Sequence, residues 1–406
     1  MFRRADILPI GLDIGHDSVK MLQLELCGGE LIARAAASRP LDPLLRAKGE
    51  AAMDAALEVA ADLLRRGGFI GRRVVAALPR EIVHIKNLRL PLMPAAELPT
   101  AIRFEARNIF PFDTESAYVD YLAVSEVRQG GDVRQEVIVL AARQAEVDDF
   151  LERLDRVGMI VDSLDADPCA LYRTVEKFVR RRDDDLEVHV LIDVGLRRTQ
   201  VVIGRGRELT FVKPIDIGGQ RLNEIVAQRL GITMAEAQSL RRRLSAMPQE
   251  GGVDGQESVR QAVFNATRAI MEELGREVSL CLRYHSVTFR GPGPTRVRVL
   301  GGEANDPNLR TVLGAALSMP VEVGRPLISV NCSECKAANQ PGPMCEWATA
   351  LGLVLKKTGG KFPPRDGSRR STRAAVGEVI DLNQAVASAG ESRASDNKAT
   401  AEVARA

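Results

Sequence analysis

Aromatic residues and charge of one sign are both scarce in this sequence. Its 406 residues include one Trp, four Tyr and 11 Phe, which is little material for a surface that stacks nucleic-acid bases. The 56 basic residues almost balance the 54 acidic ones, so the formal net charge is only +2. Proteins built mainly to bind nucleic acid carry a strongly basic surface. We therefore expect no nucleic acid among the partners of this chain.

Long apolar runs are missing as well. A membrane-spanning helix needs about 18 or more consecutive apolar residues, and no such run occurs, so no transmembrane segment is expected. Asp6 and Asp13 interrupt the apolar stretch near the N-terminus too early for the core of a signal peptide. The six cysteines are scattered, which fits reduced thiols better than a disulfide framework. These absences predict a cytoplasmic protein.

An internal repeat is the most informative feature that the sequence does contain. Residues Gly11–Lys20 read GLDIGHDSVK, and residues His189–Gly206 read HVLIDVGLRRTQVVIGRG. In each copy, apolar residues alternate on both sides of an Asp-x-Gly corner, and this period of two is typical of a β-hairpin. The corners begin at Asp13 and at Asp193. The repeat predicts an α/β protein of two related halves, each opening with the same hairpin.

Between the two hairpins, strand-like and helical stretches alternate. They lie at residues 83–90, 97–109, 136–143 and 145–157. Their pattern predicts a small α+β subdomain inserted into the first half. The expected domains are residues 1–81 and 164–187 for the first half, 82–163 for the inserted subdomain, 188–356 for the second half and 357–406 for a tail. The tail has too little apolar material to offset its ordering entropy, so we expect it to be disordered.

The Asp-x-Gly corner has a chemistry that suits a phosphate chain. Glycine lets the backbone approach a phosphate closely, and successive N–H groups can form an anion-binding concavity. Ser18 and Lys20 follow the first corner and would add donors, whereas Asp13 would act through a water-bound Mg²⁺. One corner alone is equally well explained as a tight hairpin turn. Two corners, with LGGEA at Leu300–Ala304 after a further strand, favour descent from a nucleotide site.

These motifs resemble those of the actin-like ATPase superfamily and, within it, the PilM family of cytoplasmic type IV pilus assembly proteins. GLDIGHDSVK and LIDVGLRRT look like the two phosphate loops, IDIGGQRLNE like a Gly-Gly segment entering a helix, and VLGGEA like the adenosine loop. The segments more specific to PilM are Leu88–Phe112, Val139–Met159, Leu164–Leu171 and Trp347–Leu355. The resemblance covers roughly residues 7–356. It implies the actin-like ATPase fold, with ATP and Mg²⁺ as cofactors.

The resemblance also implies roles for individual residues. The nucleotide-binding residues would be Asp13, Gly15, Ser18, Lys20, Asp193, Gly195, Thr199, Gly218, Gly219, Gln238, Arg241, Gly301 and Gly302. Asp13 and Asp193 would hold Mg²⁺ through water. Asp167, in the segment that connects the two halves, would be a catalytic residue that positions the attacking water. The alternative for Asp167 is the N-cap of a helix that begins before Pro168.

Several residues depart from the family's usual pattern. His16 and Asp17 stand where small residues are usual, and a carboxylate beside a triphosphate costs binding unless Mg²⁺ or an arginine offsets it. Arg197 and Arg198 in the second loop either supply that charge or are solvated. Glu303 replaces a small residue beside the adenosine. Three states of the site stay open: efficient ATP turnover, nucleotide binding without much hydrolysis, and a degenerate site; at most a weak ATPase is expected.

The function implied by the resemblance is that of a scaffold. The chain would bind the short cytoplasmic N-terminal peptide of a PilN-like inner-membrane protein, in a groove where the inserted subdomain meets the first half. It would then sit at the inner membrane without crossing it, and nucleotide would tune the geometry between the halves. The alternatives are an actin-fold ATPase or kinase whose turnover is its main role, and a filament-forming, membrane-tethered relative like FtsA. Whether the chain forms a homo-oligomer stays open.

Overall fold

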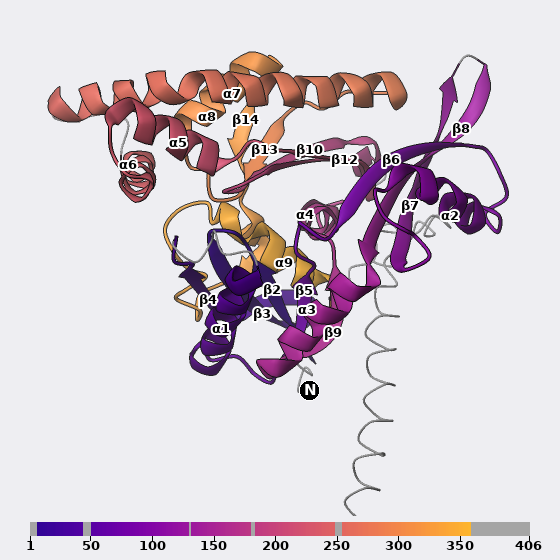
Figure 1. Ribbon diagram of the computed structural model, residues 1–406, viewed down its shortest axis with the longest axis horizontal. Coiled ribbons are helices and arrows are strands. Elements are labelled where there is room, and N and C mark those ends of the chain that lie inside the picture. The colour runs from indigo at the N-terminus through magenta and orange to yellow at the C-terminus, as the bar shows by residue number, and fades with distance from the viewer. Residues whose placement is uncertain (1–5, 44–49, 130, 180–182, 248–253, 359–406) are drawn as a thin grey trace, which may run out of the picture.

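The computed structural model describes residues 6–43, 50–129, 131–179, 183–247 and 254–358. In these residues the chain forms two layered α/β halves, with a small subdomain at one side (Figure 1). The part of the predicted disordered tail from residue 359 onward lies outside the described residues. Within the described ranges, no helix has both the length and the apolar composition that crossing a membrane requires.

The first half is built on one sheet that contains the first hairpin. Its strands are β1 (Asp6–Ile7), β2 (Ile10–Ile14), β3 (Ser18–Cys27), β4 (Glu30–Pro40), β5 (Arg73–Ala77), β9 (Ile160–Asp165) and β15 (Val330–Asn331). They lie in the order β15-β4-β3-β2-β5-β9, with β1 paired to β3. Side chains on both faces of the hairpin, such as Leu12, Met21 and Leu22, are fully buried. Both faces are therefore covered, which explains why β2 and β3 are apolar throughout.

The second half repeats this topology. Its strands are β10 (Val188–Val194), β11 (Thr199–Arg205), β12 (Glu208–Ile215), β13 (Val297–Leu300) and β14 (Val321–Val323), in the order β12-β11-β10-β13-β14. β2 and β10 take equivalent places, because each pairs antiparallel with the next strand of its hairpin and parallel with a strand that follows a helix. The predicted fold class of two related halves is confirmed.

The inserted subdomain has a sheet of its own. Its strands are β6 (His84–Pro91), β7 (Ala117–Gln129) and β8 (Asp132–Arg143), all antiparallel, in the order β6-β8-β7. Helix α2 (Leu98–Ile109) packs its buried face, Leu98, Ile102 and Ala106, against this sheet. Helix α3 (Gln144–Arg156) follows and leads back into β9 of the first sheet. An α+β subdomain inserted into the first half is thus present, while the residue boundaries of the domains stay a prediction.

Two helices lie stacked between the sheets (Figure 1). α4 (Asp167–Glu176) packs on the second sheet and α9 (Ala348–Leu355) on the first. Gly352 lets them approach closely, because a Cβ there would lie 1.8 Å from the carbonyl oxygen of Ala170. The other helices are α1 (Glu50–Arg66), α5 (Gly219–Leu230), α6 (Met234–Ala246), α7 (Asp254–Thr288) and α8 (Pro307–Leu317). The two halves therefore meet through a tightly packed helical layer, and the hairpin turns face each other beside it.

Candidate nucleotide site between the two halves

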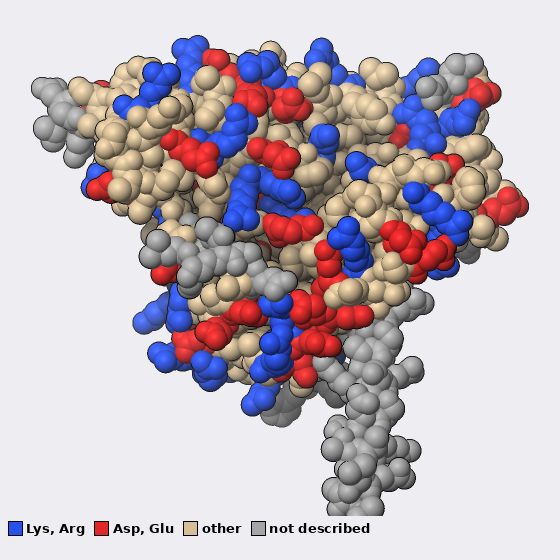
Figure 2. All heavy atoms as spheres, viewed as in Figure 1, with Lys and Arg blue, Asp and Glu red and all other residues tan. Residues whose placement is uncertain are grey.

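A cavity of about 1060 Å³ opens between the two halves. Its wall is formed by the turns of both hairpins, the segment after β13, and parts of α1 and α3. In the face shown in Figure 2, acidic and basic side chains lie side by side across the middle of the molecule. The predicted site residues in this wall are Asp13, Gly15, Ser18, Lys20, Asp193, Gly195, Gly301 and Gly302. The sequence therefore predicted a set of distant residues that the fold does bring together.

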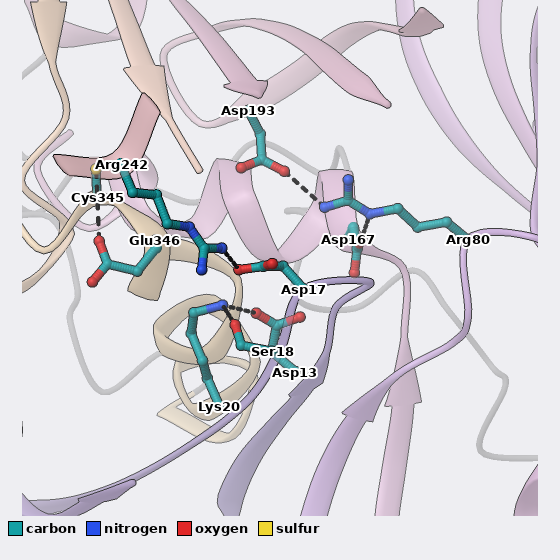
Figure 3. A network of polar contacts seen from close by, with 10 residues as sticks. All are labelled: Asp13, Asp17, Ser18, Lys20, Arg80, Asp167, Asp193, Arg242, Cys345 and Glu346. Carbon is teal, nitrogen blue, oxygen red and sulfur yellow. Dashed lines mark hydrogen bonds and ion pairs between the residues drawn. The ribbon is translucent and has the colours of Figure 1, made fainter. Parts of the chain in front are cut away.

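The turn of the first hairpin is compact and internally bonded. The Gly15 N–H donates to the carbonyl oxygen of Ser18 across 3.1 Å. The Lys20 ammonium donates to the Ser18 hydroxyl at 2.9 Å, and Lys20 Nζ lies 3.8 Å from Asp13 Oδ2 (Figure 3). Burial raises the pKa of Asp13 to about 6, although Lys20 opposes this shift. Asp13 is thus a buried carboxylate whose principal cationic neighbour is Lys20.

The turn of the second hairpin has the same backbone bond. The Gly195 N–H donates to the Arg198 carbonyl oxygen across 3.0 Å. Thr199 does not reach the cavity, because its buried hydroxyl donates to the carbonyl oxygen of Ile217 at 2.6 Å. Arg198 is not available to offset Asp17 either, since its Nε lies 2.9 Å from Asp216 Oδ1. The matching turns confirm the repeat down to single hydrogen bonds.

Gly218 and Gly219 serve the packing of α5 against the second turn. The Gly219 N–H donates to the Gly195 carbonyl oxygen at 3.0 Å, and a Cβ at Gly218 would lie 2.6 Å from the Leu196 carbonyl oxygen. Only glycine permits this approach. Neither residue is part of the cavity wall, so their role in binding nucleotide remains a prediction.

Arg80 lies between the two halves and was not predicted as a site residue. It follows β5, and its guanidinium pairs with Asp167 through Nε and with Asp193 Oδ2 through Nη2, the latter at 2.7 Å (Figure 3). Burial lowers the pKa of Arg80, but the two carboxylates outweigh it and raise that pKa. Burial raises the pKa of Asp167, which Arg80 only partly offsets. Both carboxylates thus depend on one cation.

Asp167 is neither a helix N-cap nor part of the cavity wall. The N-cap of α4 is Ala166, and Asp167 is the first residue of the helix, so the N-cap alternative is wrong. Its carboxylate is 7% exposed and points to Arg80. A role in positioning an attacking water stays a prediction.

A second contact between the halves starts from the first turn. The Asp17 carboxylate accepts a hydrogen bond from Gln238 at 3.0 Å and forms an ion pair with Arg242, both on α6 of the second half. The neighbouring His16 Nε2 lies 2.6 Å from Glu81 Oε1. The acid that departs from the family's pattern is therefore paired with Arg242 of α6. Gln238 contacts this carboxylate instead of facing the cavity.

The predicted adenosine segment is filled by a buried ion pair. Arg241 Nη2 lies 2.6 Å from Glu303 Oε2, and its Nη1 donates to Asn223 Oδ1 at 2.8 Å. Glu303 also packs against Gly219, where a Cβ would lie 2.1 Å from Glu303 Oε1. Arg241 is thus held by protein groups, so any nucleotide base at Gly301 and Gly302 would meet Glu303 first.

The residues predicted to hold Mg²⁺ do not fit that role in this arrangement. Asp193 Oδ2 is paired with the Arg80 guanidinium. Asp193 Oδ1 lies beside Gly301, where an added Cβ would be only 2.6 Å from this oxygen. Asp13 faces the Lys20 ammonium. In the described ranges, no group of three or more His, Cys, Asp or Glu side chains is placed to hold a metal ion. Both carboxylates already have a cation of the protein beside them.

Two sheets of one topology, joined by a helical layer around a central cavity, define an actin-like fold. The family model described as type IV pilus assembly protein PilM matches residues 11–358. The chain belongs to this family.

A solved structure agrees with this assignment. The chain is similar to a PilM–PilN type IV pilus biogenesis complex, at 27% identity over 86% of this chain and 98% of that one, with a TM-score of 0.70. It is also similar to the ethanolamine utilization protein EutJ from Carboxydothermus hydrogenoformans, at 14% identity, 86% and 89% coverage and a TM-score of 0.48. A third similar structure is MreB5 of Spiroplasma citri bound to AMPPNP, at 12% identity, 89% and 98% coverage and a TM-score of 0.43.

Proposed function

We propose that this chain is a cytoplasmic scaffold of type IV pilus or related secretion assembly, which binds the N-terminal peptide of a PilN-like inner-membrane protein. The observation that carries the proposal is family membership over residues 11–358. The similarity to a PilM–PilN complex, which extends over 98% of that chain, supports the partner. The chain would reach the inner membrane through this partner.

The junction of the inserted subdomain with the first half has features that suit a peptide. β9 lies at the end of the strand order of the first sheet, directly after the chain returns from α3. Its first residue, Ile160, is an apolar side chain that is 58% exposed. An edge strand offers backbone groups to an added strand, and an exposed apolar side chain beside it offers contact area. We place the partner peptide at this edge.

Calorimetric titration of the full chain with a synthetic N-terminal peptide of the PilN-like protein tests this placement. Ile160→Asp should weaken binding at least about tenfold, or about 1.4 kcal/mol. Val287→Asp is the matched control, because Val287 is 81% exposed on α7 of the second half. Absence of peptide binding by the wild type would refute the scaffold proposal, whereas equal affinities of both variants and the wild type would refute only the placement.

We also propose that the cavity binds the phosphate chain of ATP and that binding tunes the relation of the two halves. Support comes from the two matched turns, each with a glycine at the wall, and from the Lys20 ammonium beside the first turn. Turnover would be weak at most, because the carboxylate of Asp167 is engaged by Arg80. Titration with ATP and a phosphate-release assay test these two statements separately. Release that is fast and lost in Asp167→Asn would contradict the second.

A further inference from the structure

We propose that Arg80 is the built-in cation of this cavity: it takes the place of a divalent metal ion between the two carboxylates, and a phosphate chain binds beside it without Mg²⁺. The statement about the metal concerns the protein alone. The statement about the phosphate chain rests on the proposed binding of ATP.

The position of Arg80 supports the statement that it takes the place of a divalent metal ion. Its guanidinium bridges Asp167, from the helical layer, and Asp193, at the end of β10 (Figure 3). These side chains are only 7% and 8% exposed. A water-bound cation would need the outer lone pairs of the same carboxylates. Asp193 Oδ2 is paired with Arg80, and Asp193 Oδ1 lies beside Gly301, where an added Cβ would be 2.6 Å from it, so the space at this oxygen is small.

The charges around Arg80 make its presence necessary. Asp13, Asp167 and Asp193 are close enough that each of the latter two raises the pKa of Asp13. Buried carboxylates in such a group need a positive charge to stay ionised. Arginine supplies it at every pH, because it does not deprotonate in proteins. Without Arg80, two buried carboxylates would lack their cation, and a divalent ion would satisfy both.

The third nitrogen of the guanidinium, Nη1, supports the statement that a phosphate chain binds beside Arg80. Nε and Nη2 contact the carboxylates, and Nη1 lies beside the second turn, where a Cβ at Gly195 would be 3.5 Å from it. A phosphate bound at the N–H groups of this turn would therefore meet the guanidinium. Arginine recognises phosphate through its planar set of donors. The cavity thus has the positive charge that Mg²⁺ would otherwise bring.

Mn²⁺ binding, measured by electron paramagnetic resonance on the metal-free full chain, tests the metal statement without any nucleotide. We expect no Mn²⁺ site in the wild type, one site in Arg80→Met, and loss of that site in Arg80→Met/Asp193→Asn. Arg80→Lys is the matched control, because it keeps the positive charge and should bind no Mn²⁺. A wild-type site that Asp193→Asn removes, or no gain in a folded Arg80→Met, overturns the proposal. Folding is checked by the fluorescence of the single tryptophan, Trp347.

ATP affinity of the wild type, measured by calorimetry in EDTA and in Mg²⁺, tests the second statement and needs no variant. We expect the two dissociation constants to agree within about threefold, well under 1.4 kcal/mol. A loss of more than about tenfold in EDTA overturns metal-free binding. If ATP does not bind under either condition, the statement about the phosphate chain fails together with the proposed ATP binding. The Mn²⁺ measurement and the peptide titration then still decide on Arg80 and on the scaffold independently.

Discussion

Asp13→Asn should stabilise the protein at neutral pH. Burial raises the pKa of Asp13 from 3.8 to about 6, so the folded state binds the proton more tightly than the unfolded state. The contribution of Asp13 to the unfolding free energy is therefore fully present below pH 3.8 and is lost as the pH rises through about 6. The span from 3.8 to about 6 corresponds to about 3 kcal/mol once the carboxyl is fully ionised. Asparagine keeps the shape of the neutral side chain and avoids this cost.

The difference between variant and wild type isolates this residue, because other titrating groups are shared. Linkage gives a difference in unfolding free energy of about 1.5 kcal/mol at pH 5 and about 3 kcal/mol above pH 7. In the folded state, Glu81 is ionised throughout this range, because the effect of burial is outweighed by His16, which lowers the pKa of Glu81 to about 2. Urea unfolding in EDTA, followed by the fluorescence of Trp347 in the core of the first half, measures the difference. A difference that is constant from pH 5 to 7.5, or a more stable wild type at pH 7, would refute the reasoning.

Three further predictions concern the frame around the site. Burial, aided by a nearby arginine, lowers the pKa of His285 from 6.5 to about 4. The unfolding free energy of the wild type should therefore fall by up to about 3 kcal/mol as the pH falls through this range. His285→Gln should remove that loss in the same urea assay. Gly352→Ala should cost at least about 3 kcal/mol, because its Cβ would lie 1.8 Å from a carbonyl oxygen of α4. Gly293→Ala, with nothing within 4 Å, should change stability by less than about 0.5 kcal/mol in calorimetric melts. Asp17→Asn and Arg242→Ala should each loosen the contact between the halves and raise the radius of gyration by the same amount, and an additive double variant would contradict a shared contact.

The features predicted correctly from sequence are those whose pattern lies within one short segment of the chain. A hairpin places its alternating apolar residues and its corner within one short segment, so both hairpins and the relation between the halves follow from the pattern. The resemblance then assigned Asp13, Lys20 and Asp193 to loops that do line one cavity. The strands β4, β7 and β12 were not predicted, because buried or irregular apolar runs do not distinguish strand from helix.

The pairing of charges could not be predicted in the same way. Arg80 meets residues 87 and 113 positions further along the chain, and its sequence neighbours give no sign of those partners. The same holds for Asp17, which pairs with Arg242 on α6. Arg241 was assigned to the nucleotide on resemblance alone, whereas its contact with Glu303 depends on how α6 packs over the segment after β13. Ion pairs that join distant elements are properties of the packed fold.

Arg80 also provides a physical route from the cavity to the inserted subdomain. It lies in the connection between β5 of the first sheet and β6, the first strand of that subdomain. Its bond to Asp193 ties this connection to the second half. A phosphate bound at the second turn would contact Arg80 Nη1 while Nε and Nη2 stay on the carboxylates, so it would change how firmly the residues that lead into β6 are held. Since β9 pairs with β5 at the place proposed for the partner peptide, nucleotide and peptide are expected to change each other's affinity by the same factor. Such coupling would need only a contact with one side chain and no ATP turnover.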